Sequence, residues 1–187
     1  MSLVPQGGPV PVELARRIKL VVLDVDGVLT DGGVYVGLRS GEEFKRFDIQ
    51  DGLGMKLLEK AGLKVLIVSG RHSEATQFRA DELGIECYQD AGAQKLPSIM
   101  KVMARLDIAW DEVSMLGDDI PDVAVLRRVG LKAAVANAVP LVAAMADWRT
   151  VREGGHGAVR EFCDALLVAR GDFERVVEAY VAERSLP

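Results

Sequence analysis

The run Lys19-Leu-Val-Val-Leu23, which leads directly into Asp24-Val-Asp-Gly-Val-Leu-Thr30, decides the fold of this chain. The first five residues form a short apolar run, which is typical of a strand that is buried on both faces of a sheet. Two carboxylates follow where that strand ends, and Gly27 allows a sharp turn after them. Residues i and i+2 of an extended chain point to the same side, so Asp24 and Asp26 should face one site. Burying two acids together is costly unless another group compensates their charge, so this strand end predicts a functional site.

Similar apolar runs recur along the chain, at residues 63–68, 85–88, 113–116 and 131–135. Segments with helical spacing lie between them: apolar residues in 96–106 and in 159–167 recur three or four positions apart. Strands that alternate with helices in this way predict an α/β domain with a doubly wound, mostly parallel, Rossmann-like sheet.

One stretch interrupts the alternation. Residues 33–37 and 42–47 look like two strands around a glycine-containing turn, so we expect a projecting β-hairpin at about 33–48. The hairpin follows the first strand directly and therefore lies beyond the carboxyl edge of the sheet, where open α/β sheets bind their ligands.

The composition limits the classes of function. The chain has 187 residues, of which 49% are hydrophobic, and a net charge of -5. This length suits one domain, predicted at 12–181 between a flexible lead (1–11) and a tail (182–187). The acidic balance argues against nucleic acid as a ligand, and no apolar stretch reaches the ~18 residues of a membrane span. Cys87 and Cys163 are expected to be reduced core thiols of an intracellular protein.

A second group of acids follows another apolar run, in Gly117-Asp-Asp-Ile-Pro-Asp122. Asp119 or Asp122 alone could cap the helix that begins near Pro121, but three acids exceed what a cap requires. With Asp24, these carboxylates form an oxygen-ligand set for a hard cation, for which Mg²⁺ is the prediction.

Two further sites, one at Ser69 and Gly70 and one at Lys95, extend the pattern. Ser69 and Gly70 end a predicted strand just before a helix, where a hydroxyl and backbone N–H groups suit a phosphate. Lys95 opens a predicted helix, a place unfavourable for a cation, which suggests another task for its amine.

The order Asp-x-Asp-Gly, Ser, Lys and Gly-Asp-Asp-x-x-Asp resembles the four motifs of the haloacid dehalogenase-like (HAD) superfamily. Over about residues 18–170 the chain resembles more closely the family of 3-deoxy-D-manno-octulosonate 8-phosphate (KDO 8-phosphate) phosphatases. The segments with that resemblance are 26–31 with the hairpin, 47–54, 69–71 and the glycine-rich 154–161. Phosphatases of N-acylneuraminate or KDN 9-phosphate share most of these features and remain an alternative.

The resemblance implies a mechanism. Asp24 would be the nucleophile that forms an aspartyl-phosphate, and Asp26 the general acid and base. Mg²⁺ would be bound by Asp24, the backbone carbonyl of Asp26, and Asp118. Asp119 or Asp122 would support the site, acting through water or holding Lys95.

The resemblance also implies ligand contacts. The phosphoryl oxygens would be bound by Ser69, Gly70 and Lys95. Contacts to the rest of the substrate would come from Arg71, His72 and Thr30. The glycine-rich segment around His156 would either close over the substrate or be an ordinary loop.

The chain is too short for a large cap domain over the site. By resemblance, the partners are a small sugar-acid phosphate and other copies of the chain, in a homotetramer where a neighbour's hairpin closes each site. The helix expected at 173–181 would pack on its own domain or on another subunit. The location implied is the cytoplasm.

A receiver domain of a response regulator is a non-enzyme alternative, because it also combines a parallel sheet, clustered Asp, a Lys and Mg²⁺. Its phosphorylated Asp ends the third strand, whereas the third predicted strand here ends in Tyr88-Gln-Asp90. Asp-x-Asp-Gly followed by a hairpin is foreign to receivers. A regulatory domain derived from the phosphatase is disfavoured because the acids and Lys95 are all present.

Overall fold

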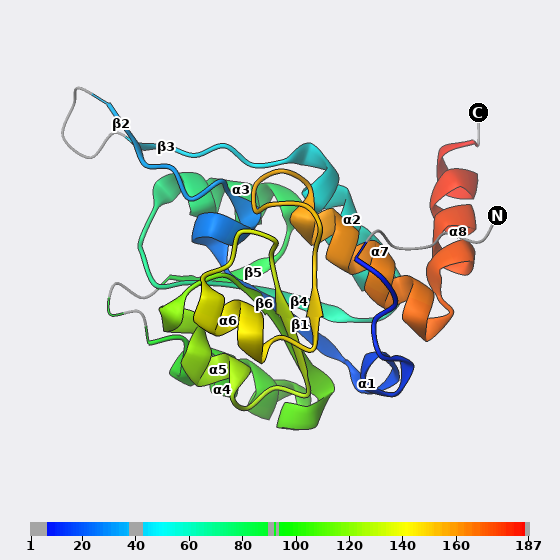
Figure 1. Cartoon of the computed structure of the whole chain (residues 1–187). Coiled ribbons are helices and arrows are strands. Elements are labelled where there is room, and N and C mark those ends of the chain that lie inside the picture. The colour runs from blue at the N-terminus through cyan, green and yellow to red at the C-terminus, as the bar shows by residue number, and fades with distance from the viewer. Residues whose placement is uncertain (1–6, 38–42, 90–91, 93, 186–187) are drawn as a thin grey trace.

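A six-stranded sheet forms the centre of the molecule, with its strands in the order β5-β4-β1-β6-β7-β8 and every neighbouring pair parallel (Figure 1). The structure is a computed structural model, and it describes residues 7–37, 43–89, 92 and 94–185. The strands are β1 (Leu20–Leu23), β4 (Lys64–Ser69), β5 (Glu86–Gln89), β6 (Val113–Gly117), β7 (Leu131–Ala134) and β8 (Trp148–Arg149). The predicted doubly wound α/β fold is confirmed.

Five of these strands match the predicted apolar runs, and β8 is the exception. It has two residues, of which Trp148 is buried and Arg149 exposed. Such a short segment has no periodicity that a sequence pattern could reveal. It pairs with β7 at the edge of the sheet, where Trp148 lies opposite Ala133 and extends the parallel ladder.

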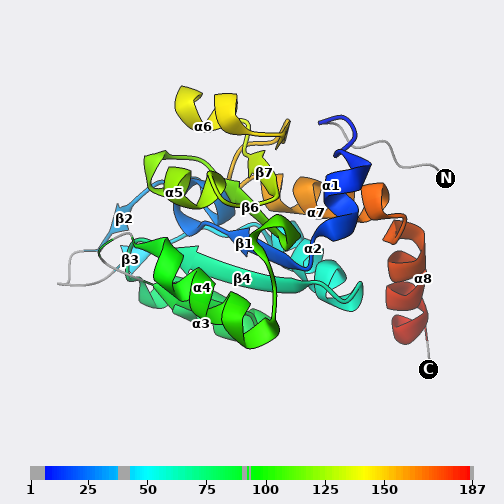
Figure 2. The same ribbon diagram turned by 90° about the horizontal axis from the view of Figure 1, so that it is seen from below.

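Alternate residues of β1 enter two separate hydrophobic clusters, one on each face of the sheet. Val21 and Leu23 pack in the cluster under α2 (Ile49–Lys60), α3 (Glu74–Leu83) and α7 (Ala158–Arg170). Leu20 and Val22 pack in the other cluster. The helices on that second face are α4 (Lys95–Leu106), α5 (Val123–Leu126) and α6 (Pro140–Met145). Figure 1 shows one helical layer above the sheet and the other below it, and Figure 2 shows the molecule from the side of α4, α5 and α6.

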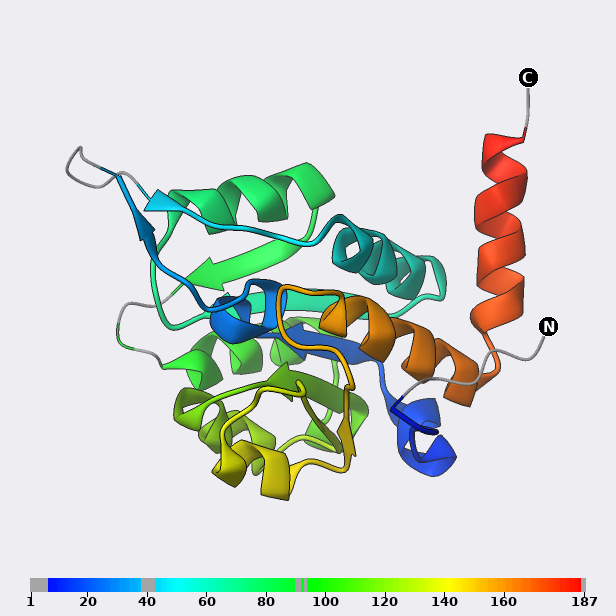
Figure 3. The same ribbon diagram turned by 45° about the horizontal axis from the view of Figure 1, so that its top comes forward.

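The expected hairpin is present as β2 (Tyr35–Val36) and β3 (Glu43–Phe44), which pair antiparallel and project from the body (Figures 1 and 3). Among the described residues, each strand has two paired residues, fewer than the sequence predicted. An isolated antiparallel bridge between Thr30 and Phe47 joins its base to the segment after β1. The turn expected at 38–41 and the first residue of the second predicted strand, residue 42, lie outside the described residues.

The two ends of the chain differ from the predicted lead and tail. Residues 1–6 lie outside the described part, but Val10 is 1% exposed and the Trp148 indole donates a hydrogen bond to the Gly8 carbonyl (3.0 Å). The second half of the lead is therefore packed against β8 and leads into α1 (Val12–Arg17). At the other end, residues 182–184 continue the last helix, and 186–187 lie outside the described part.

That last helix, α8 (Phe173–Arg184), packs on helices of its own chain. Val176 is fully buried in the cluster that α7 and α2 share, and the Lys60 ammonium forms an ion pair with Glu183. Of the two packings expected for this helix, its first half thus packs on its own domain, while Val181 in the second half is exposed. None of the described helices is long and apolar enough to span a bilayer. Both cysteines are free thiols, as expected.

Helices α2 and α7 approach closely because α2 contains glycines. A Cβ atom at Gly54 would lie 3.1 Å from the Arg160 Cα of α7. Beside it, Asp51 accepts a hydrogen bond from the Arg160 backbone N–H (2.7 Å). This carboxylate caps α7, whose own N-cap residue, Gly157, has no side chain to do so. Burial raises the pKa of Asp51 to about 7.

We expect Asp51→Asn to change how stability depends on pH. Because the pKa of Asp51 is higher in the folded state, the folded protein binds the extra proton, and this residue makes wild-type stability fall as pH rises from about 4 to about 7. A rise from 3.8 to about 7 corresponds to at most about 4 kcal/mol. In urea denaturation, the free energy of unfolding of the variant should rise relative to that of wild type between pH 5 and pH 8.

Asp172→Asn is the matched control. The pKa of Asp172 is lowered, because hydrogen bonds from Arg175 and Arg170 outweigh its burial, so its titration lies below pH 5. Its effect on the free energy of unfolding should be the same at pH 5 and pH 8. A pH-independent difference between Asp51→Asn and wild type would contradict the role assigned to Asp51.

Candidate active site

The carboxyl ends of three adjacent strands bring the predicted motifs together. Leu23 of β1 pairs with Ile67 of β4 on one side and with Leu116 of β6 on the other. Asp24, one residue beyond that register, and Asp118, two residues beyond it, therefore stand at the same edge of the sheet. The loop that follows Ser69 begins at this edge as well.

The chain turns tightly after Asp24, through a single helical turn (η1, Val25–Leu29) that contains two non-helical residues. Asp26 has φ -77° and ψ 113°, and Gly27 has φ +88°, which a side chain rarely allows. A Cβ atom at Gly27 would also lie 2.1 Å from Asp118 Oδ2. The glycine of Asp-x-Asp-Gly thus permits both the turn and the approach of the second acidic loop.

Three carboxylates meet there: oxygens of Asp24, Asp118 and Asp122 all lie within 4.8 Å of one another. Asp24 is 7% exposed and Asp122 1% exposed, and Asp118 Oδ1 is buried without a hydrogen-bond partner. Burial, reinforced by the neighbouring carboxylates, raises the pKa of both Asp24 and Asp118 above the usual range of an aspartate. The cluster holds more negative charge than its protein surroundings neutralise.

Lys95, the first residue of α4, provides one compensating charge. Its buried ammonium lies 2.5 Å from Asp24 Oδ1 and 2.5 Å from Asp122 Oδ1. Burial lowers the pKa of Lys95, but the two carboxylates outweigh that effect and the net shift is upward. The lysine is therefore a cation in the folded protein, which accounts for its unfavourable place at a helix N-terminus.

Asp122 is fully engaged by the protein. Its Oδ1 contacts Lys95, and its Oδ2 accepts the Asp118 backbone N–H (3.0 Å). A Cβ atom at Gly117 would lie 2.4 Å from that Oδ2, so the glycine makes room for the contact. Asp119 is exposed, and its Oδ1 accepts the Ile120 N–H (2.7 Å), which caps the short helix η3 (Ile120–Asp122).

The arrangement fits a divalent cation. Three carboxylates and one ammonium leave an excess of two negative charges if all are ionised, and Asp118 Oδ1 is a buried oxygen with no other partner. Asp24 and Asp118 are the carboxylates that could bind the ion, because Asp122 is taken up by Lys95 and the loop. Oxygen ligands of this kind suit Mg²⁺. Coordination by the Asp26 carbonyl stays a prediction.

A cavity of about 210 Å³ opens beside the cluster. Its lining consists of Asp24, Asp26, Gly70, Arg71, Lys95, Asp118, Asp119, Pro121 and Asp122. Most of the predicted site residues are thus brought together on one surface.

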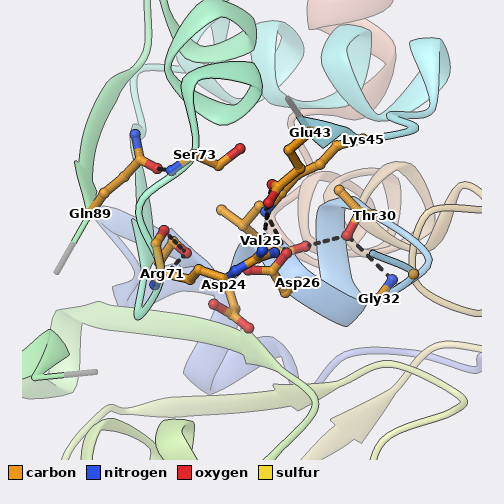
Figure 4. A network of polar contacts seen from close by, with 12 residues as sticks. Asp24, Val25, Asp26, Thr30, Gly32, Glu43, Lys45, Arg71, Ser73 and Gln89 are labelled. Carbon is orange, nitrogen blue, oxygen red and sulfur yellow. Dashed lines mark hydrogen bonds and ion pairs between the residues drawn. The ribbon is translucent and has the colours of Figure 1, made fainter. Parts of the chain in front are cut away.

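Three predicted contact residues do not line this cavity. The Ser69 hydroxyl donates to the Arg71 carbonyl (2.8 Å) and accepts the Arg71 N–H (3.0 Å), so it shapes the loop. Thr30 is 1% exposed, and its hydroxyl donates to the Val25 carbonyl and accepts the Gly32 N–H. His72 is exposed and is not part of the cavity lining. Figure 4 shows Thr30 turned toward the loop that it closes.

The sequence analysis missed two residues of the hairpin. Lys45 Nζ lies 2.5 Å from Asp26 Oδ1, and a Glu43 oxygen lies 2.5 Å from the Arg71 guanidinium (Figure 4). Opposite charges two residues apart on a strand face the same side. The opposite charges of Glu43 and Lys45 could have indicated an ion pair from the sequence, but they could not indicate that Asp26 and Arg71 would lie beside them.

The glycine-rich segment packs against η1, the turn that carries Asp26. The Gly155 N–H donates to the Val28 carbonyl (3.0 Å), and a Cβ atom at Gly154 would lie 1.7 Å from the Gly27 carbonyl oxygen. The Arg46 guanidinium donates to the Gly155 carbonyl (2.5 Å) and so ties the hairpin to the segment. The glycine-rich segment therefore packs against η1, and a role in closing over the substrate stays a prediction.

The family model of haloacid dehalogenase-like hydrolases matches residues 89–162. The 3-deoxy-D-manno-octulosonate 8-phosphate phosphatase KdsC of Escherichia coli K12 is 41% identical over 170 residues, covering 89% of this chain and 90% of that protein. The chain belongs to this family of HAD-like phosphatases.

Solved structures of the family agree with the fold. The KDO 8-phosphate phosphatase of Yersinia pestis is 40% identical with a TM-score of 0.82, covering 87% of this chain and 88% of that one. The enzyme of Moraxella catarrhalis, in complex with magnesium, phosphate and KDO, is 36% identical with a TM-score of 0.84, covering 90% and 97%. Membership of this family excludes the receiver-domain alternative.

Gly154→Ala should displace η1, the turn that carries Asp26. The new methyl group would overlap the Gly27 carbonyl oxygen, so η1 must shift, and a shift of about 1 Å at a catalytic group can cost about a hundredfold in rate. We expect kcat for a phosphate ester to fall at least about tenfold, and the melting temperature to fall with it.

Gly62→Ala is the control, because Gly62 has φ +92° but a Cβ atom added there would meet no other atom within 4 Å. It should lower stability through backbone strain alone and leave kcat close to wild type. Equal kcat in wild type and Gly154→Ala would show that the segment does not support the turn.

Proposed function

We propose that this chain is a Mg²⁺-dependent phosphatase that hydrolyses 3-deoxy-D-manno-octulosonate 8-phosphate through an aspartyl-phosphate on Asp24. The observation that supports it is the group of Asp24, Asp122 and Lys95, all buried, with the half-buried Asp118, beside a cavity at the carboxyl end of β1. The named relatives hydrolyse this ester, and one of them has been solved with magnesium, phosphate and KDO.

Asp24 is proposed as the nucleophile. Its Oδ1 is held by Lys95 at 2.5 Å, which fixes the carboxylate and leaves Oδ2 for attack on phosphorus. Forming the acyl-phosphate releases the sugar alcohol, and water then cleaves the acyl-phosphate to give inorganic phosphate. The transition state of phosphoryl transfer is loose, so alignment and charge neutralisation matter more than the basicity of the nucleophile.

Asp26 is proposed as the general acid and base. It lines the cavity two residues after Asp24, with its side chain 34% exposed. It would protonate the leaving sugar oxygen in the first step and take a proton from the attacking water in the second. Its position in the lining of the same cavity as the proposed nucleophile supports this role.

Asp24 and Asp118 are the proposed carboxylate ligands of Mg²⁺. The bound ion supplies charge neutralisation between the phosphate ester and the nucleophilic carboxylate. Asp122 keeps Lys95 in place, and Asp119 caps η3 at the rim of the cavity.

The phosphoryl group is proposed to lie between Lys95 and the loop of Gly70 and Arg71. A cavity of about 210 Å³ is smaller than the usual pocket for a whole small-molecule ligand, so the sugar part must extend beyond it. Arg71 lines the cavity and is exposed, and its guanidinium suits the carboxylate of a sugar acid.

We further propose a homotetramer in which a neighbour's hairpin covers the sugar part of the substrate. Exposed apolar side chains support this, since a monomer rarely exposes a large apolar patch. They gather on the hairpin and on α2 and α3 near it: Val34, Tyr35, Val36, Phe44, Ile49 and Phe78. A cytoplasmic location is part of the same proposal and stays a prediction.

Asp24→Asn and Asp118→Asn test the chemistry separately from the fold. Asp24→Asn should lower kcat for KDO 8-phosphate by at least about a thousandfold, because an amide is a poor nucleophile. Asp118→Asn should weaken the rise in melting temperature that Mg²⁺ causes in wild type, since one ligand charge is lost. Wild-type turnover by Asp24→Asn would refute the nucleophile.

The substrate is tested by a screen with Mg²⁺ of KDO 8-phosphate, N-acylneuraminate 9-phosphate, KDN 9-phosphate and hexose phosphates. We expect the highest kcat/KM for KDO 8-phosphate. A higher value for a nine-carbon ester would assign the chain to the alternative substrate with the same chemistry.

The oligomer is tested by replacing Val36 and Phe44 with Asp in one variant. Charges at 78% and 59% exposed apolar positions should disrupt subunit contacts, so sedimentation should show smaller species and kcat/KM should fall. Leu141→Asp, at a 50% exposed position on α6, is the matched control and should sediment as wild type. A fully active wild-type monomer would refute the proposal.

A further inference from the structure

Lys45, a residue of the hairpin, contacts Asp26 in η1. Its Nζ lies 2.5 Å from Asp26 Oδ1 and 3.7 Å from Glu43 Oε1. Its side chain is 1% exposed, although the residue follows a two-residue strand of a projecting hairpin. Burying an ammonium at such a place is costly unless opposite charges pair with it, and these two carboxylates provide the pairing.

The hairpin is built to place Lys45 there. β3 pairs with β2, and the bridge between Thr30 and Phe47 fixes the chain two residues after Lys45. Residues alternate along this segment: Glu43 and Lys45 turn toward the site, while Phe44 is 59% exposed. Arg46 reaches the Gly155 carbonyl instead. The segment is thus held on both sides of Lys45, and Figure 4 shows its side chain meeting Asp26.

Asp26 needs such a partner. Its backbone lies in the non-helical part of η1, and its side chain is 34% exposed, unlike the buried Asp24 and Asp122. The acidic cluster and Lys95 do not include it. Lys45 is the side chain found to hold it in the described part of the chain.

We propose that Lys45 is a positioning residue for the general acid and base: it holds Asp26 Oδ1 so that Oδ2 faces the leaving oxygen of the ester. The inference rests on the proposed function, because it takes Asp26 as the proton donor. Glu43 completes the arrangement, since it pairs with Lys45 and, through its other oxygen, with Arg71 at 2.5 Å. Glu43 of β3 and Lys45 just after it therefore hold both the proposed proton donor and an arginine that lines the cavity.

The test measures how kcat/KM depends on the leaving group. kcat/KM reports the step in which the ester bond breaks, and phenols that leave easily need little protonation. Lys45→Met should lower kcat/KM for KDO 8-phosphate by about tenfold to a hundredfold, less than Asp26→Asn does. It should hardly affect 4-nitrophenyl phosphate, and phenyl phosphate should fall between the two.

Lys45→Arg keeps a cation that can reach Asp26, so it should restore most of the wild-type ratio between 4-nitrophenyl and phenyl phosphate. This ratio does not depend on how much of a variant is folded. Lys132→Met is the matched control, because Lys132 also pairs with an aspartate (Asp147, 3.5 Å) but lies on β7 away from the cavity. Its ratio should equal that of wild type.

An unchanged ratio in Lys45→Met, with KDO 8-phosphate and both aryl phosphates losing activity equally, would overturn the positioning role and leave the proposed function standing. Loss confined to KDO 8-phosphate, with no change between the aryl phosphates, would also overturn it and would assign Lys45 to binding the sugar acid. A wild-type protein that hydrolyses no phosphate ester would refute the proposed function and this inference together.

Discussion

The buried ammonium of Lys95 between Asp24 and Asp122 is the interaction on which the site depends. Carboxylates so close together and so far from water would repel one another, and burial alone already raises the pKa of Asp24 and of Asp118. Lys95 offsets part of this charge and fixes one oxygen of each partner. The remaining negative charge, concentrated at Asp24 and Asp118, is what a divalent cation would neutralise.

Close backbone packing makes this concentration of acids possible. Gly27 leaves room for Asp118, Gly117 for Asp122, and Gly154 for the carbonyl of Gly27. The contacts of Gly27 and Gly154 join segments that follow different strands, so the parallel sheet in which β1 lies beside β6 is a precondition for both. The contact of Gly117 lies within the loop that follows β6. The glycines make a rigid setting for charged groups whose geometry must vary little during phosphoryl transfer.

The hairpin gives a small domain some of what a cap domain would provide. Its inward face holds Asp26 and Arg71 through Lys45 and Glu43, and its outward face presents Val36 and Phe44. Alternation along a strand separates these two tasks. One short element thus contacts residues of its own site and, in the proposed homotetramer, would also contact another subunit.

The sequence by itself determined the α/β fold and the strand after which the candidate site lies, because apolar periodicity is a local pattern. It also pointed to Asp24, Asp26, Lys95 and Asp118, because each follows an apolar run or opens a helix, which is likewise visible locally. It missed β8, which is too short to have a period. Only the tertiary structure decided which side chains reach the cavity. Ser69 and Thr30 close loops, whereas Lys45 meets an aspartate 19 residues away in the sequence. Such pairings depend on how loops turn and how distant segments pack, and no local pattern encodes that geometry.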